Sequence, residues 1–593
     1  MNWKLKARYV IFVAGVLGIA ALLIGSYAKL LVREGGNADD ERKKLENSLE
    51  VAWGERGCIY DCNEHLISAS APMCELNMDV TVFFDRKGNL KDFYKENIDM
   101  ACRVVAEQFR EETASELRRR IEKGVGESAS YSKKHNGRHK HVKLVKRLVT
   151  LDEAKELKEK EFFRKGSNMS GLVVDRYPKR FNMFNDEAKR VVGEFDIKSG
   201  VAKYGLELYY DSVLRGEPGT SIKTKVGKKQ IPVLSEEPVD GQDLVLTIDM
   251  DIQDMAESIM RDKVALCSAS RGCMIVMEVE TGEIKAMVNL ARDSSGFIQQ
   301  GPNACVALSD QPGSTFKTVC MMAALEEGLV SPDEEFDVNY GRPVTFGPGE
   351  TISDSHEYSK QFLSANEIMM YSSNIGMARI VNKFKNNKAG RRRFIDAVKA
   401  TGFAHQIEIE AVNAKHPTIY DPDSAYDKRT YGGWSSPTMR SMSRGYEVKS
   451  TPLYTLNFYN AIANDGYYVE PHLVKEFRRG GEVITKVEPL KIGRRMCSRG
   501  TLDKIRNMLR MVAQRDGGTA CNSLKGLNAA GKTGTAQLHR RKDGSFDGYQ
   551  LSFAGYYPAD EPKYSCVVVL YDCPQMLTGI GCVDAFRQIM TKL

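Results

Sequence analysis

Residues 311–317 read Gln-Pro-Gly-Ser-Thr-Phe-Lys and begin the most informative segment of this chain. A proline and a glycine interrupt the chain just before Ser314, and residues 315–327 then form a helix-compatible, largely apolar stretch that ends at Gly328. Ser314 and Lys317 are three positions apart, so a helix places their side chains side by side. The start of a helix also stabilises negative charge through its free N–H groups. The segment therefore predicts a serine hydroxyl held beside an amine.

A second polar motif, Ser372-Ser373-Asn374, lies between two helix-compatible stretches, residues 365–371 and 375–381. A hydroxyl and an amide two positions apart at such a junction can both point into one cleft. On its own, a tripeptide of this kind is more often an ordinary polar junction between helices.

The third motif is Lys532-Thr533-Gly534-Thr535, in a strand-compatible run. Side chains alternate along a strand, so Lys532 and Gly534 are expected on one face and the two threonines on the other. Because Gly534 has no side chain, we expect a substrate backbone to approach the strand closely there.

A competing interpretation of the third motif is a phosphate-binding loop. Residues 526–533 match the pattern G-x-x-x-x-G-K-[ST] letter for letter. Such a loop follows a buried strand and opens a helix, whereas residues 522–525 are polar and a strand-like run starts at residue 534. The context therefore disfavours nucleotide binding.

The sequence around the motifs predicts one antiparallel sheet built from both ends of residues 241–593. A β-rich run at 243–248 precedes a helix at 249–263, and the alternation at 272–279 and 283–289 is typical of a hairpin. Two more strands, at 551–556 and 564–571, and a closing helix at 583–593 come at the other end.

The N-terminal end predicts a membrane anchor. Residues 9–28 carry no charge and would span about 30 Å as a helix, the thickness of a bilayer hydrocarbon core. The basic residues Lys4, Lys6 and Arg8 place residues 1–8 in the cytoplasm and the rest of the chain outside. A cleaved signal peptide is the alternative, since residues 26–28 resemble a cleavage site.

Between the anchor and residue 241, the sequence predicts a stalk and a mixed α/β pedestal over residues 29–240. Residues 29–50 are strongly charged, and short strand-like pieces at 57–60 and 172–175 alternate with charged helical stretches at 107–123 and 152–164. The chain is thus divided into a tail (1–8), an anchor (9–28), a stalk and pedestal (29–240) and a C-terminal domain (241–593).

Composition excludes several classes of function. The net charge, 85 − 78 = +7 over 593 residues, is too dilute to indicate nucleic acid. The 13 cysteines show no zinc-finger spacing, and we expect them to be buried free thiols without an essential disulfide. His135, His139 and His141 have no carboxylate or thiolate nearby, so no metal site is expected.

The three motifs occur in the order S-x-x-K, S-x-N, K-T-G, a set known from penicillin-binding proteins and β-lactamases. With the anchor and pedestal, the chain resembles a class B penicillin-binding protein over nearly its whole length. Pedestal signatures of that class are matched by residues 56–61, 176–178, 205–207 and 214–216. The S-x-N triplet and residues 552–555 (SFAG) resemble the septal, cell-division branch. Cys62 and Glu64 depart from the usual Arg and Gly, which leaves the local turn of the pedestal open.

This resemblance implies an α+β multidomain fold with a serine β-lactamase-like C-terminal domain, and the activity of a peptidoglycan D,D-transpeptidase. Ser314 would be the nucleophile, and Lys317 its base when uncharged. Ser372 would relay the proton to the leaving amine, and Asn374 would hold Lys317 and the substrate amide. The reference pKa of lysine, about 10.4, has to fall for this role, and we expect burial and the charge of Lys532 to lower it.

The resemblance also assigns the substrate-binding groups. Lys532 with the hydroxyls of Thr533 and Thr535 would bind the substrate carboxylate beside Gly534. The backbone N–H groups of Ser314 and Thr535 would form the oxyanion hole. No metal or organic cofactor is implied.

The expected ligands are peptidoglycan stem peptides, lipid-linked nascent glycan and β-lactams. A SEDS-type glycan polymerase and divisome proteins are the expected membrane partners, at the cytoplasmic (inner) membrane. Four alternatives remain open: an elongation-type class B enzyme, a non-catalytic divisome scaffold, a β-lactam sensor, and a β-lactamase or carboxypeptidase.

Overall fold

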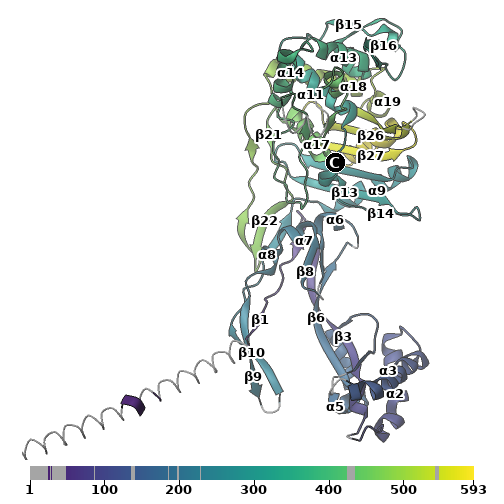
Figure 1. Ribbon diagram of the computed structural model, residues 1–593, viewed down its shortest axis with the longest axis vertical. Helices are drawn as coiled ribbons and strands as arrows, with labels where there is room; N and C mark the ends of the chain where they lie inside the picture. Colours follow the sequence, from purple (N-terminus) through teal and green to yellow (C-terminus); the bar gives the residue numbers. More distant parts are fainter. Residues whose placement is uncertain are drawn as a thin grey trace, which may run out of the picture. The chain divides into compact units, whose positions relative to one another are not determined.

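Figure 1 shows the computed structural model of the chain. It describes residues 24–26, 29, 49–85, 87–134, 140–184, 186–196, 199–226, 229–423, 434–540 and 546–593. The predicted tail 1–8 and the anchor 9–28, except for residues 24–26, lie outside these ranges, as do His135 and His139. No helix within the described ranges has the length and apolar character needed to cross a bilayer.

The chain forms two compact units, Met1–Gly57 with Arg215–Gln242, and Cys58–Leu214 with Asp243–Leu593. In its described part, the first unit contains an antiparallel sheet of β1 (Leu49–Ala52), β9 (Gly219–Val226) and β10 (Lys229–Glu236), in that order. The predicted domain boundary at residues 240/241 stays a prediction.

In the second unit, one sheet combines strands of the predicted pedestal with strands of the C-terminal segment. Its order is β23 (Glu482–Lys486), β22 (Val474–Arg479), β11 (Asp243–Leu246), β2 (Ile59–Tyr60), β3 (Leu66–Asp79) and β4 (His141–Lys143). Strands β5 (Val149–Thr150) and β6 (Leu172–Asn182) also pair with β3. Pairing of β11 with both β2 and β22 ties the two segments into one unit.

The helices of the pedestal differ from the expected ones. The predicted helix at 107–123 is two helices, α2 (Asp92–Phe109) and α3 (Ala114–Lys134). Arg110 adopts a left-handed conformation (φ 51°) that ends α2, and such a residue stops the helical hydrogen-bond pattern. The helix predicted at 152–164 is α4 (Leu151–Glu159), which begins at a capping box between Thr150 and Glu153.

The predicted antiparallel sheet is confirmed. Its order is β14 (Ile298–Gln300), β13 (Ile284–Arg292), β12 (Arg271–Glu278), β27 (Tyr564–Cys573), β26 (Phe546–Tyr557) and β25 (Ala530–Arg540). The central pair β12 and β27 joins the two ends of the C-terminal segment, with Ile275 opposite Val567. The expected helix at 249–263 is α9 (Met250–Leu266), and the closing helix is the shorter α20 (Asp584–Met590).

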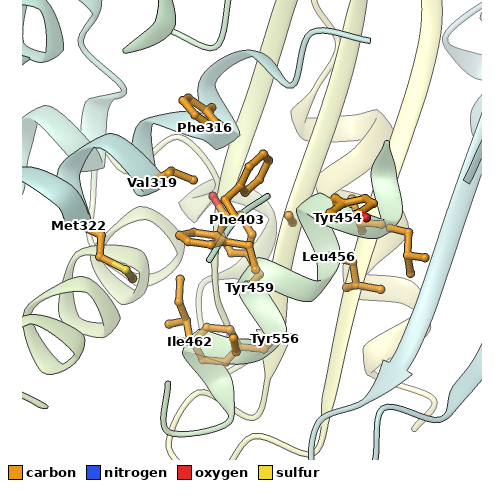
Figure 2. Packing of buried hydrophobic residues seen from close by; sticks show 14 of the residues in the cluster. Phe316, Val319, Met322, Phe403, Tyr454, Leu456, Tyr459, Ile462 and Tyr556 are labelled. Carbon is orange, nitrogen blue, oxygen red and sulfur yellow. The ribbon is translucent and has the colours of Figure 1, made fainter. Parts of the chain in front are cut away.

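Helices cover both faces of this sheet. The side chains of β12 point alternately to the two faces, and on each face they pack in a separate apolar cluster. Met274 and Val276 pack in a cluster with α9 and α20. Cys273, Ile275 and Met277 face the other cluster, which contains α11 (Lys317–Glu326) and α17 (Pro452–Ala463). Figure 2 shows this second cluster, where Tyr459 of α17 lies between the side chains of α11 and Tyr556 of β26.

The other helices of the second unit surround the site or connect the strands. They are α5 (Ser167–Ser170), α6 (Lys189–Val192), α7 (Gly205–Tyr209), α10 (Ala304–Ala307), α12 (Ala365–Tyr371), α13 (Asn374–Asn382), α14 (Lys388–Ala400), α16 (Thr438–Met442), α18 (Arg499–Gln514) and α19 (Cys521–Leu524). Short two-stranded sheets pair β7 (Glu194–Asp196) with β8 (Val201–Tyr204), β15 (Glu335–Asp337) with β18 (Phe362–Ser364), β16 (Val344–Gly347) with β17 (Glu350–Ile352), β19 (Thr418–Ile419) with β20 (Val448–Lys449), and β21 (Tyr468–Val469) with β24 (Lys491–Ile492).

All 13 cysteines are free thiols, as expected, and all but Cys58 and Cys62 are buried. Burial raises the pKa of the Cys102 thiol to about 11. These side chains therefore act as small apolar groups in the core.

Candidate active site

The first motif forms a tight turn ahead of the helix. Residues Gly313–Phe316 form a 3-10 turn (η3), and the regular helix α11 starts only at Lys317. The expectation of a regular helix from residue 315 is therefore wrong by one short turn. In a 3-10 turn, side chains three positions apart eclipse each other, which keeps Ser314 next to Lys317. The hydroxyl of Thr315 donates to the Pro312 carbonyl (2.7 Å) and fixes the turn.

Lys317 is buried with no exposed surface, yet its amine is fully hydrogen-bonded. The Nζ atom donates to the Ser372 carbonyl (2.5 Å), the Ser372 hydroxyl (3.1 Å) and Oδ1 of Asn374 (2.8 Å). Within the described residues, none of its three hydrogen bonds goes to Ser314. The first two motifs thus meet through the lysine.

The surroundings of Lys317 allow both protonation states near neutral pH: the ammonium can donate all three hydrogen bonds, whereas the neutral amine has only two N–H groups to donate. The Lys317 pKa falls to about 7, chiefly because burial disfavours the charged form. Asp354 opposes this shift and Arg444 adds to it through their charges. Arg444 is thus a cationic neighbour that the sequence did not predict. The predicted neighbour, Lys532, also interacts with Lys317, because the charge of Lys317 lowers the Lys532 pKa.

The second motif is a strained junction held by a carboxylate. Ser372 ends α12 in the left-handed region (φ 59°), which is costly for a residue with a side chain and recurs at functional sites. The Asp354 carboxylate accepts hydrogen bonds from the Ser373 hydroxyl (2.6 Å) and from the backbone N–H groups of Asn374 and Ile375 (3.0 Å for Ile375). Nδ2 of Asn374 donates to the Ser353 carbonyl (3.1 Å), so its Oδ1 is turned toward Lys317.

The third motif lies on β25, in register with β26. Lys532 is opposite Ala554 and Gly534 is opposite Ser552. A strand therefore occupies the place where a phosphate loop would open a helix, and α19 precedes it where a buried strand would be required. The nucleotide-binding alternative is excluded by this local structure.

Gly534 is required for packing. A Cβ atom there would lie 2.2 Å from Oγ of Ser552 and 3.1 Å from Cγ2 of Thr315. The space that we expected a substrate backbone to use is taken up by the first motif and by β26.

Lys532 is also completely buried, and among the described residues its amine donates only to Thr533, at the carbonyl (3.1 Å) and the hydroxyl (3.4 Å). Burial and then the charge of Lys317 lower the Lys532 pKa well below its ordinary value. Two buried amines near each other cannot both hold a proton without strong repulsion.

The three motifs converge on one cleft of about 640 Å³. Ser314, Ser372, Asn374, Thr533 and Thr535 line it, whereas Lys317, Lys532 and Gly534 lie behind its surface. The cleft offers hydroxyl groups for nucleophilic attack and for binding, with a neutral amine directly behind them.

Sequence patterns missed several residues of the cleft. Asp354, Arg444, Tyr446, Thr519 and Thr578 line it, and none belongs to a motif. Thr519 and Thr578 hydrogen-bond the hydroxyls of Thr533 (2.8 Å) and Thr535 (3.1 Å). Among these residues, only Asp354 had a recognisable sequence context, because it is an acidic residue that precedes two helix starts. Acidic residues are common at such positions, so this context does not identify a functional residue.

No cluster of three or more potential metal ligands is present in the described part of the chain. The polar side-chain groups that line the cleft are hydroxyls, two amides, a carboxylate and a guanidinium, and such a set is suited to acyl transfer by a serine nucleophile.

Two family descriptions match this chain. Residues 272–591 match the penicillin binding protein transpeptidase domain, and residues 52–246 match the penicillin-binding protein dimerisation domain. Among curated proteins, PbpB of Mycobacterium tuberculosis is 30% identical over 65% of this chain and 56% of its own length. PbpB of Mycolicibacterium smegmatis is 28% identical over 68% of this chain and 63% of its own length. FtsI of Escherichia coli, named a peptidoglycan D,D-transpeptidase, is 25% identical over 68% of this chain and 64% of its own length.

Solved structures share the fold. Penicillin-binding protein 2X of Streptococcus thermophilus superimposes with a TM-score of 0.67 at 18% identity, covering 91% of this chain and 79% of that protein. Penicillin-binding protein 3 of Mycobacterium tuberculosis in complex with aztreonam gives 0.62 at 22% identity, covering 92% and 96%. With both domains matched and the three motifs gathered at one cleft, the chain belongs to the class B penicillin-binding proteins.

Proposed function

We propose that this protein is a membrane-anchored peptidoglycan D,D-transpeptidase that cross-links stem peptides through a serine acyl-enzyme, in septal cell-wall synthesis. The observation that carries the proposal is the buried Lys317 amine. Its pKa of about 7 leaves it neutral often enough to act as a base, and it lies behind the cleft that Ser314 lines.

In the first half of the reaction, Ser314 attacks the carbonyl between the two terminal D-alanines of a stem peptide. Lys317 takes the hydroxyl proton, and the backbone N–H groups of Ser314 and Thr535 stabilise the oxyanion. Loss of one such donor costs about 10²–10³ in rate in well-studied hydrolases. The first N–H groups of a helical turn have no partner inside that turn, which suits Ser314 for this role.

Collapse of the tetrahedral intermediate expels D-alanine. Ser372 is placed to pass the proton from Lys317 to the leaving amine, because its hydroxyl accepts a hydrogen bond from the lysine. In the second half, an amine from another stem peptide attacks the ester carbonyl and gives a proton to neutral Lys317. The ester C–O bond then breaks, the cross-link forms, and the Ser314 oxygen takes the proton back from Lys317. No metal or cofactor takes part in either step.

The cellular setting rests on the sequence and the relatives. The uncharged stretch 9–28 supports a single-pass anchor with residues 1–8 in the cytoplasm and the domains 29–240 and 241–593 on the other side of the inner membrane. The names FtsI and PbpB among the relatives support a septal role. The proposed partners, which follow from the resemblance of the sequence motifs, are divisome proteins and a SEDS-type polymerase that supplies glycan from its lipid-linked precursor. The aztreonam complex of a structural relative supports β-lactams as inhibitors.

Labelling with a fluorescent penicillin tests the chemistry. We expect a covalent label on the wild type that persists for hours, and none on Ser314→Ala. Ser130→Ala is the matched control, because Ser130 and Lys133 form a second S-x-x-K pattern in α3. Label that is absent from the wild type would refute the transpeptidase, and label that is lost within minutes would indicate a β-lactamase.

Localisation of a tagged copy in dividing cells tests the setting. A band at the septum supports the septal branch, and a uniform sidewall signal supports the elongation-type alternative. Membrane fractionation tests the anchor. We expect washed membranes to retain the full chain but not a chain that starts at residue 29.

A further inference from the structure

The charged group that was expected to bind the substrate carboxylate does not line the cleft. A stem peptide ends in a carboxylate, which a protein recognises best with a charged donor. The amine expected to supply that charge, Lys532, does not line the cleft and is bonded to Thr533. Thr533 and Thr535 provide hydroxyls at the cleft surface but no charge.

Arg444 is the basic side chain among the described residues that line the cleft. It follows α16 and is half-buried. Within the described residues, Nε of Arg444 donates to the Arg440 carbonyl (3.2 Å), and the side chain forms no ion pair. The guanidinium lies over the Tyr446 ring, 5.7 Å from its centre. Its two terminal nitrogens have no hydrogen-bond or ion-pair partner in that part of the chain.

Arg440, one helical turn earlier, is a useful comparison because its guanidinium is fully engaged by protein groups. It is buried, pairs with the Glu350 carboxylate and donates to Oδ1 of Asn382 (3.1 Å). Glu350 and Glu447 lie close enough to Arg444 to affect its pKa, but neither forms an ion pair with it. Asp354, the acidic residue of the cleft lining, is occupied by Ser373 and the start of α13.

The backbone holds Arg444 beside the reacting groups. A Cβ atom on Gly445 would lie 1.9 Å from the Gly313 carbonyl oxygen, and the Gly313 N–H donates to the Gly445 carbonyl (3.3 Å). Gly445 has φ +81°, a conformation that suits glycine. On the other side, the N–H of Gln537 donates to the Tyr446 hydroxyl (3.4 Å). Arg444 is thus fixed between the Ser314 turn and the β25 strand that carries Thr533 and Thr535.

We propose that Arg444 is the specificity-determining residue for the substrate carboxylate, binding the terminal carboxylate of the donor stem peptide with its two free guanidinium nitrogens beside the Thr533 and Thr535 hydroxyls. Arginine suits this role because its planar fork matches the two oxygens of a carboxylate. The inference rests on the proposed transpeptidase function and assigns to Arg444 the charge that the sequence had assigned to Lys532.

The test compares benzylpenicillin, which carries a free carboxylate, with its methyl ester. Second-order acylation rate constants are measured for the wild type, Arg444→Ala and Arg444→Lys. A charge-assisted hydrogen bond is worth about 10- to 100-fold. We expect Arg444→Ala to lose that factor with the acid and less than about threefold with the ester. Arg444→Lys should fall in between, because it keeps the charge but not the fork.

Two controls separate this role from others. Lys449→Ala removes an exposed charge nearby in the sequence and should leave both rate constants unchanged. Lys532→Ala should lower the acylation rate constants for benzylpenicillin and for its methyl ester by the same factor. Thermal unfolding of each variant checks that it is folded.

An unchanged acid-to-ester ratio in Arg444→Ala would overturn the inference, as would collapse of that ratio in Lys532→Ala alone. Equal losses with both compounds, with the acidic limb of the pH profile moved to higher pH, would also overturn it and leave Arg444 with only its effect on the Lys317 pKa. A wild type that reacts with neither compound would refute the proposed function itself.

Discussion

The two walls of the cleft are built by different physical means. On one wall, the Ser372–Asn374 junction is held by side-chain hydrogen bonds to Lys317 and to the Asp354 carboxylate. On the other, β25 is held by the backbone ladder with β26, and its threonines follow from strand alternation. The first wall depends on a few charges and donors, and the second on close packing. Single substitutions should therefore affect the first wall through electrostatics and the second through steric overlap.

The largest effect is expected at the centre of the first wall. Lys317→Met keeps the length of the side chain but removes the base, so acylation should fall by about 10²–10⁴. The free energy of unfolding should fall by about 1–3 kcal/mol, because the Ser372 carbonyl and Oδ1 of Asn374 lose their donor. Stopped-flow acylation and urea unfolding measure the two effects. Acylation within tenfold of the wild type would show that another group is the base.

Asp354→Asn should have the next largest effect, because it removes the carboxylate that holds the junction. We expect acylation to fall about 10- to 100-fold, in line with the loss of charged hydrogen bonds. In the wild type, acylation should rise with pH through about 7, as Lys317 becomes neutral. Asp354 raises that pKa, so its removal should lower it and move the acidic limb to lower pH.

A pH–rate profile of penicillin acylation measures that shift. Movement of the limb to higher pH would contradict the assignment of Asp354 as the opposing charge. Asp333→Asn, at an exposed carboxylate outside the cleft, is the control and should leave the profile in place.

On the second wall, Gly534→Ala should act through packing. The new methyl group overlaps Ser552 and Thr315, and overpacking of this kind costs about 1–3 kcal/mol. We expect a lower free energy of unfolding and acylation reduced about tenfold, with no shift of the pH profile. The double variant Gly534→Ala/Ser552→Ala removes the closest atom and should recover part of the stability. No recovery would mean that the overlap with Thr315 dominates.

The smallest effect is expected for Thr519→Val, which removes one hydroxyl that hydrogen-bonds Thr533. An ordinary hydrogen bond contributes about 1 kcal/mol, so acylation should fall by about fivefold or less. The same kinetic assay measures it. A loss as large as that of Asp354→Asn would show that the second wall also depends on its side-chain hydrogen bonds.

The sequence predicted best those elements whose pattern lies within a few consecutive residues. Alternation and hairpin signals gave the strands at both ends of the C-terminal segment, and the sheet β14-β13-β12-β27-β26-β25 confirms them. It was least informative about helix ends in the pedestal, where Arg110 breaks a continuous charged stretch that reads as one helix. Local helix propensity does not predict the left-handed conformation of Arg110 that ends α2 there.

The order of the three motifs and the spacing of Ser314 and Lys317 were enough by themselves to indicate the family and its residue types. Only the tertiary structure decided which charges face the cleft: Lys532 lies behind the surface, and Arg444 and Asp354, which belong to no motif, line it. The reason is physical. Residue identity is local, but burial, and with it the protonation of an amine, depends on which distant segments pack around it.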